Sequence, residues 1–137
     1  MDSITQSPTV SNKRLWAGRI MSALAVLFLM FDGVIHVLKP APVVQGFTDL
    51  GWSPTLAVPL GIIELVCLAL YLIPRTSVLG AVLLTGYLGG AIASWVRLGE
   101  PNPMMVPLST CLLLWAGLYL REDRLQALLP LRKKAAP

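Results

Sequence analysis

Residues 15–38 read LWAGRIMSALAVLFLMFDGVIHVL, an apolar run long enough to decide the fold class. At about 1.5 Å of rise per residue, a helix of this length spans roughly 36 Å, more than the hydrocarbon core of a bilayer, which is about 30 Å thick. Nine of the twelve residues from 27 to 38 are apolar, but Asp32 and His36 interrupt them. The stretch predicts a membrane-spanning helix that carries two ionisable side chains.

The rest of the chain repeats this pattern. Hydrophobic residues make up 55% of the 137 residues and charged residues only 13%, about half the charged fraction of an average soluble domain. Further apolar segments occupy about residues 56–73, 78–96 and 104–120, and the turn sequences PRTS and GEPNP separate the last three spans. The predicted fold class is all-α, a transmembrane four-helix bundle embedded in a lipid bilayer.

The chain outside the spans is short. Residues 1–13 are polar and are predicted to be a disordered tail, residues 14–122 form the membrane domain, and residues 123–137 form a basic tail. In the longest link, Val43, Val44, Phe47 and Leu50 follow helical spacing before Gly51. We therefore expect a short interfacial helix between the first and second spans, which acts as a lid.

The positive charges predict the orientation. If the N-terminus is cytoplasmic, nine of the eleven Lys and Arg residues lie inside, and only Lys39 and Arg97 lie outside. Both termini are therefore expected in the cytoplasm, with Trp52 and Trp95 near the outer interface. Because the basic residues gather at the chain ends and not on an amphipathic face, a nucleic-acid partner is excluded.

Polar and small residues recur on one face of each of the first three spans, at alternating spacings of three and four. Such faces are typical of a bundle interior, so the three are expected to meet. They are Ser22, Ala25, Leu29, Asp32 and His36; Ala57, Gly61, Glu64, Leu68 and Tyr71; and Leu83, Tyr87, Gly90, Ser94 and Arg97.

The predicted site is an outward-facing polar pocket between these faces. A charge near the bilayer centre costs about 2.5–3.5 kcal/mol on the insertion scale, so buried carboxyl groups need partners, protons or water. Asp32, Glu64 and His36 are the candidate acid–base residues, and Tyr87, Ser94 and Arg97 the candidate substrate-binding residues. The alternative is a polar network that only sets helix register. The glycines of TGYLGGAIAS, residues 85–94, are predicted to form a close-packing face.

Metal and haem sites are not expected from the sequence pattern. Cys67 and Cys111 lie inside apolar segments without a C-x-x-C or Cys/His spacing, which favours buried free thiols. His36 is the only histidine of the chain, so two histidines of one chain cannot ligate a haem.

Several stretches resemble the DoxX-like family of small bacterial membrane proteins. They are FDGVIHVLKP in the first span and LGIIELVCLALYLIPRTSVLGAVLLTGYLGGAIASWVRLG across the second and third. The resemblance covers about residues 15–122. Its most specific positions are Gly61, Glu64, Leu65, Tyr71 to Thr76, Leu79 to Ala81, Gly90, Ala91 and Arg97. It implies a multi-pass protein of the bacterial cytoplasmic membrane, from a family associated with quinol oxidation, sulfur metabolism and thiol or oxidative-stress systems.

Three functions fit these features. The first is a redox-associated subunit that binds a quinone or another lipophilic molecule and exchanges electrons with a redox partner protein. The second is a membrane-embedded acid–base enzyme on a small lipophilic substrate without a redox cofactor. The third is a non-catalytic transporter or assembly subunit, which at this size would form a homo-oligomer.

Overall fold

The computed structural model describes residues 11–128, so most of each predicted tail, residues 1–10 and 129–137, lies outside the described part. Within it the chain is helical, with no strand among the described residues. In chain order the elements are α1 (Asn12–Leu38), α2 (Ala41–Asp49), the 3₁₀ helix η1 (Pro54–Leu56), α3 (Ala57–Leu72), α4 (Ser77–Leu98), α5 (Pro101–Arg121) and α6 (Asp123–Leu128).

The long helices end where the backbone chemistry requires it. Lys39 ends α1 with a left-handed φ of 52°, and the following Pro40 has no N–H to continue the helix. Gly99 ends α4 with a φ of 73°, which glycine adopts without a steric penalty, and Pro101 then occupies the first turn of α5. The predicted turn sequences therefore mark the junctions between the spans, although α5 begins at Pro101, inside GEPNP, and not at the predicted residue 104.

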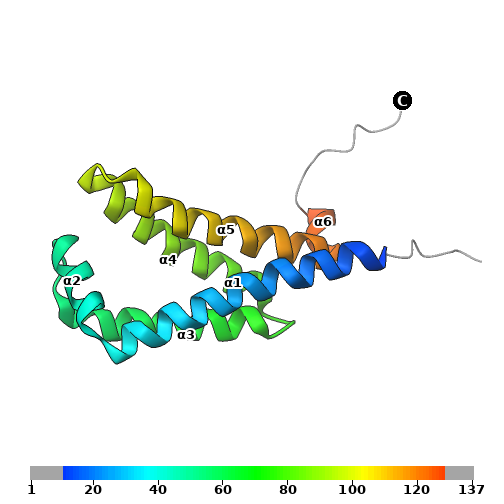
Figure 1. The fold of residues 1–137 in the computed structure, drawn as a ribbon. Helices are drawn as coiled ribbons and strands as arrows, with labels where there is room; N and C mark the ends of the chain where they lie inside the picture. Colours follow the sequence, from blue (N-terminus) through cyan, green and yellow to red (C-terminus); the bar gives the residue numbers. More distant parts are fainter. Residues whose placement is uncertain (1–10, 129–137) are drawn as a thin grey trace, which may run out of the picture.

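The four long helices form one bundle in which neighbours run antiparallel (Figure 1). The helices that pack against one another are α1 with α3, α3 with α4, α4 with α5, and α5 with α1. Short α2 covers one end of the bundle, and α6 lies at the other end (Figure 1). Each long helix is long and apolar enough to cross a membrane, which confirms the predicted fold class.

Large apolar side chains cover the outside of the bundle. Leu27 and Phe31 on α1 and Leu112 on α5 each expose about two thirds of their surface (65%, 65% and 64%). Such side chains are unfavourable in water but suit contact with lipid tails. The protein is therefore an integral membrane protein.

The start of α1 and the short helix α6 lie at the same end of the bundle (Figure 1). Arg14 at the start of α1 pairs with Asp123 of α6 and donates a hydrogen bond of 3.2 Å to Gln126. These contacts join α6, which lies within the predicted C-terminal tail, to the start of α1, which begins at Asn12 within the predicted N-terminal tail. That this end faces the cytoplasm stays a prediction from the positive charges.

The bundle is tightly packed near the chain ends. The Tyr71 hydroxyl lies 3.0 Å from Ser22 Oγ and donates a 3.1 Å hydrogen bond to the Leu114 carbonyl, so one buried side chain joins three helices. Gly80 of α4 lies against the backbone of Tyr71, and a Cβ at position 80 would collide with it. This half contains most of the buried core, including Leu29, Leu68, Leu84, Leu114 and Leu118.

The packing changes along α4. Its buried residues are Ser77, Gly80, Ala81, Leu84 and Leu88, and the described helix beyond Leu88 buries none. The sequence predicted that the interior face of this helix runs through Leu83. This prediction is wrong in the first half of α4, because Leu83 is exposed and Leu84 points inward. In the other half, Tyr87, Gly90 and Ser94 line a cavity instead of a core.

We expect Gly80→Ala to destabilise the folded protein by about 1–3 kcal/mol, because the added methyl group overlaps main-chain atoms that cannot rotate away. The measurement is thermal unfolding in detergent, followed by circular dichroism. Gly89→Ala is the matched control, since nothing lies within 4 Å of a Cβ there and alanine favours a helix by about 0.5–1 kcal/mol over glycine. Equal melting temperatures for the two variants would contradict this packing.

Candidate functional site

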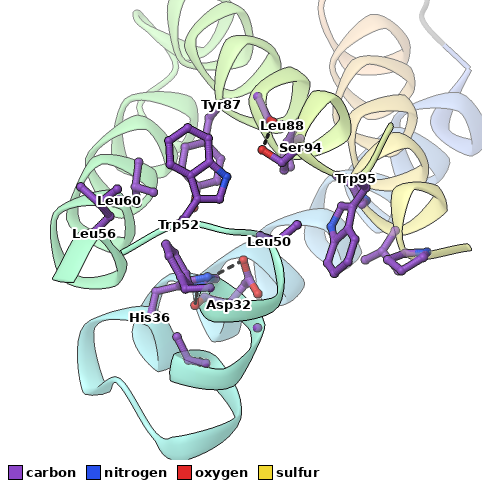
Figure 2. A pocket seen from close by; sticks show the side chains of 18 of the residues that line it. Asp32, His36, Leu50, Trp52, Leu56, Leu60, Tyr87, Leu88, Ser94 and Trp95 are labelled. Atoms are coloured by element: carbon purple, nitrogen blue, oxygen red, sulfur yellow. Dashed lines mark hydrogen bonds and ion pairs between the residues drawn. The ribbon is translucent and has the colours of Figure 1, made fainter. Parts of the chain in front are cut away.

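A cavity of about 670 Å³ opens in the loosely packed half of the bundle, at the end that α2 covers. Its walls come from all four long helices and from the segment between α1 and α3 (Figure 2). Most of the lining is apolar, with side chains such as Phe28, Leu60, Trp95 and Val106. We call this cavity the chamber. Its size lies within the range of about 300–1,000 Å³ that is typical of small-molecule sites.

Helix α2 closes the chamber from one side. Phe47 is 8% exposed, and its ring packs edge-on against His36 with the centroids 5.7 Å apart. At the end of α2, the guanidinium of Arg97 donates a hydrogen bond to the carbonyl of Leu50. The short helix is therefore present as predicted, and it is attached to both α1 and α4.

Arg97 lies at the rim. Of the predicted substrate-binding residues, Tyr87 and Ser94 line the chamber, while Arg97 is not among its lining residues and instead contacts the main chain of Leu50. Within the described residues it forms no ion pair with Asp32 or Glu64; the salt bridges found there join Arg14 to Asp123 and His36 to Asp32. The structure therefore gives Arg97 a contact that holds α2.

Asp32 and His36 line the chamber from α1 with a carboxyl group and an imidazole (Figure 2). Their spacing of four residues places them on one face of α1. His36 Nδ1 lies 2.7 Å from the main-chain oxygen of Asp32 and 3.4 Å from its carboxylate Oδ2. Both side chains are half-buried, so they are accessible to a molecule in the chamber.

Glu64 of α3 lies beside this pair. One potential metal-ligand atom from each of Asp32, His36 and Glu64 lies within 4.8 Å of the other two. Glu64 is 0% exposed, and neither of its carboxylate oxygens has a hydrogen-bond partner among the described residues. Tyr87 of α4 adjoins Glu64, which connects the group to a third helix. An unpartnered carboxyl group at such a depth is unfavourable, so the arrangement is incomplete without a ligand, an ion or a proton.

Close contact of α1 and α3 brings these residues together. A Cβ at Gly61 would lie only 2.8 Å from the carbonyl oxygen of Gly33 and 2.8 Å from Cβ of His36. Glycine at position 61 therefore allows the two backbones to approach, and Glu64 follows one helical turn later on the same face. The predicted polar faces of α1 and α3 therefore do meet.

The glycines of α4 have another role than the predicted one. No atom lies within 4 Å of a Cβ built at Gly86, Gly89 or Gly90, so the prediction of a close-packing face is wrong. Gly86 and Gly90 line the chamber instead, because the missing side chains leave space there. Ser94 Oγ donates a 2.9 Å hydrogen bond to the Gly90 carbonyl and has remaining acceptor capacity.

Residues that the sequence did not single out complete the wall. Trp52 and Trp95 line the chamber, although they were expected only at the membrane interface. Pro103 and Pro107 of α5 line it as well. Pro107 has no N–H, so the Pro103 carbonyl four residues earlier lacks its usual helical donor and is free to accept a hydrogen bond. A proline inside an apolar span is the sequence signal that could have identified this position.

Comparison of the sequence with known protein families agrees with this membrane architecture. The DoxX-like family matches residues 20–117, which cover more than half of the chain and include most of the four spans and all of the residues that line the chamber. The curated proteins and the solved structures contain no match to the chain. With the four membrane spans in place, the chain belongs to the DoxX-like family.

Proposed function

We propose that this protein binds a small lipophilic molecule with a hydrogen-bonding head group in the chamber, as a redox-associated membrane protein whose ligand is a quinone or quinol. The observation that carries the proposal is the chamber itself, an apolar cavity of about 670 Å³ with its ionisable groups gathered at one wall. Small-molecule sites have this composition, in which apolar walls supply binding and a few polar groups supply orientation.

A quinol fits both the apolar residues and the polar groups of the chamber wall. Its ring and side chain would contact apolar residues such as Phe28, Leu60 and Val106. Its hydroxyl groups would donate hydrogen bonds to the Asp32 carboxylate, and in the oxidised form its carbonyls would accept one from the Tyr87 hydroxyl. The electrons would pass to or from a partner protein. With the termini in the bacterial cytoplasm, the chamber opens toward the outer face of the membrane.

A second candidate is an acid–base enzyme on a lipophilic substrate without an electron acceptor. The approach of Asp32 and Glu64 from different helices favours it, because such pairs provide both an acid and a base. In either candidate function, Asp32, Glu64 and His36 would have the predicted catalytic roles. A register-setting network is less favoured, since such networks are satisfied internally and Glu64 is not.

Filling the chamber should prevent binding. We expect Ala91→Phe, which adds a ring to the chamber wall, to weaken binding of a short-chain quinol by about tenfold or more, equivalent to about 1.4 kcal/mol. Binding is measured in detergent by quenching of tryptophan fluorescence, since Trp52 and Trp95 line the chamber.

Ala93→Phe is the matched control, because Ala93 lies on the same helix with an exposed side chain outside the chamber lining. It should bind the quinol like the unmodified protein. Equal affinities for the two variants would exclude the chamber as the binding site. Mass spectrometry of lipophilic molecules that co-purify with the protein identifies the natural ligand, and turnover without an electron acceptor would favour the acid–base enzyme.

The head group should contact Asp32. Asparagine at this position keeps the size but removes the charge, and a hydrogen bond to a charged group contributes about 1.5–3 kcal/mol. We expect Asp32→Asn to weaken binding of the quinol by roughly ten- to a hundredfold while changing the affinity for its dimethyl ether less than threefold. Equal losses of affinity for the quinol and for its dimethyl ether would show that the head group does not contact Asp32.

A further inference from the structure

We propose that Asp32, His36 and Glu64 form a binding site for a divalent transition-metal ion at the wall of the chamber. The three side chains come from two helices, and their donor atoms lie within 4.8 Å of one another. Ligands that surround one ion at about 2.0–2.2 Å lie roughly 3–3.5 Å apart, so small side-chain rotations close the cluster around an ion. The site does not depend on the quinol proposed above.

Glu64 is the independent observation that points to a ligand. It is 0% exposed, and both carboxylate oxygens lack partners within the described residues. Buried charges in proteins are paired or coordinate metals, because an isolated carboxylate loses several kcal/mol of solvation. Of its neighbours Asp32, Tyr87 and His36, only the His36 imidazole can carry a positive charge, and Arg97 is engaged by Leu50. A metal ion between Asp32 and Glu64 would supply the missing positive charge.

His36 has a main-chain contact of the kind that commonly orients metal-binding histidines. Its Nδ1 lies 2.7 Å from the Asp32 main-chain oxygen, and an N–H donated there orients the imidazole and leaves the other ring nitrogen with a free lone pair. Ligation of the metal by one ring nitrogen while the other is bonded to a carbonyl oxygen is the usual arrangement.

The donor set restricts the kind of ion. One imidazole and two carboxylates suit Zn²⁺, Fe²⁺ or Mn²⁺, whereas Mg²⁺ and Ca²⁺ prefer oxygen ligands alone. Three protein ligands also leave at least one coordination position free, as in catalytic zinc sites. Because Asp32 and His36 line the chamber, an oxygen atom of a bound molecule would be able to occupy that position. A metal centre was not predicted because its ligands are distributed over two spans.

The test uses tag-free, full-length protein in detergent. The protein is stripped with EDTA and titrated with Co²⁺ and Zn²⁺ in the absence of any quinol; Co²⁺ binding is followed by visible absorption and Zn²⁺ binding by calorimetry. We expect about one ion per chain, with affinity at least tenfold lower in Glu64→Gln and in His36→Gln. Glu100→Gln is the control, since Glu100 is exposed at the start of α5 and lies outside the cluster.

Circular dichroism and size-exclusion profiles establish that the variants are folded. If Glu64→Gln does not fold, His36→Gln and the Co²⁺ spectrum of the unmodified protein, which reports nitrogen and oxygen ligation, still decide the outcome. No ion per chain in the unmodified protein, or unchanged affinity in His36→Gln, would overturn the proposal. Quinol binding to the EDTA-treated protein is measured separately, so failure of the metal site and failure of the proposed function are distinguishable.

Discussion

The contact between Gly61 on α3 and α1 is the constraint on which the site depends. A side chain at position 61 would collide with the Gly33 carbonyl and with His36, so the two helices approach this closely only because position 61 is glycine. In a bilayer, where lipid tails are as apolar as the helices, such close packing is a main source of helix association. The same contact places the Glu64 carboxyl group beside Asp32 and His36.

The bundle has two halves with different packing. Near the chain ends, Gly18, Gly80 and Gly117 lie against neighbouring backbones, and the Tyr71 hydroxyl joins α3 to α1 and α5. In the other half, Gly86 and Gly90 have open space in front of them. Glycine therefore removes a side chain for two different purposes, close packing in one half and a chamber in the other.

The polar groups of the open half lie in surroundings that strengthen their electrostatic interactions. The chamber is lined mainly by apolar residues, so the Asp32, His36 and Glu64 group lies in a low-dielectric surrounding where electrostatic interactions are stronger than in water. Helix α2 covers this group on one side through Phe47, and the contact of Arg97 with Leu50 joins α4 to the end of that helix. A lipophilic molecule and a metal ion would both gain from this environment.

The sequence by itself determined the membrane class, the four spans, the short helix between the first two, and the family resemblance, because hydropathy and turn residues are local properties. It also placed Asp32 and His36 on one face of α1, since spacing along one helix is local too. The sequence also predicted that Glu64 meets them. Only the tertiary structure decided how closely Glu64 approaches them, that Leu84 points inward where Leu83 was expected, that the α4 glycines border a cavity, and that Arg97 binds Leu50. These depend on how the helices rotate and approach one another, which is set by side-chain packing between segments far apart in the chain.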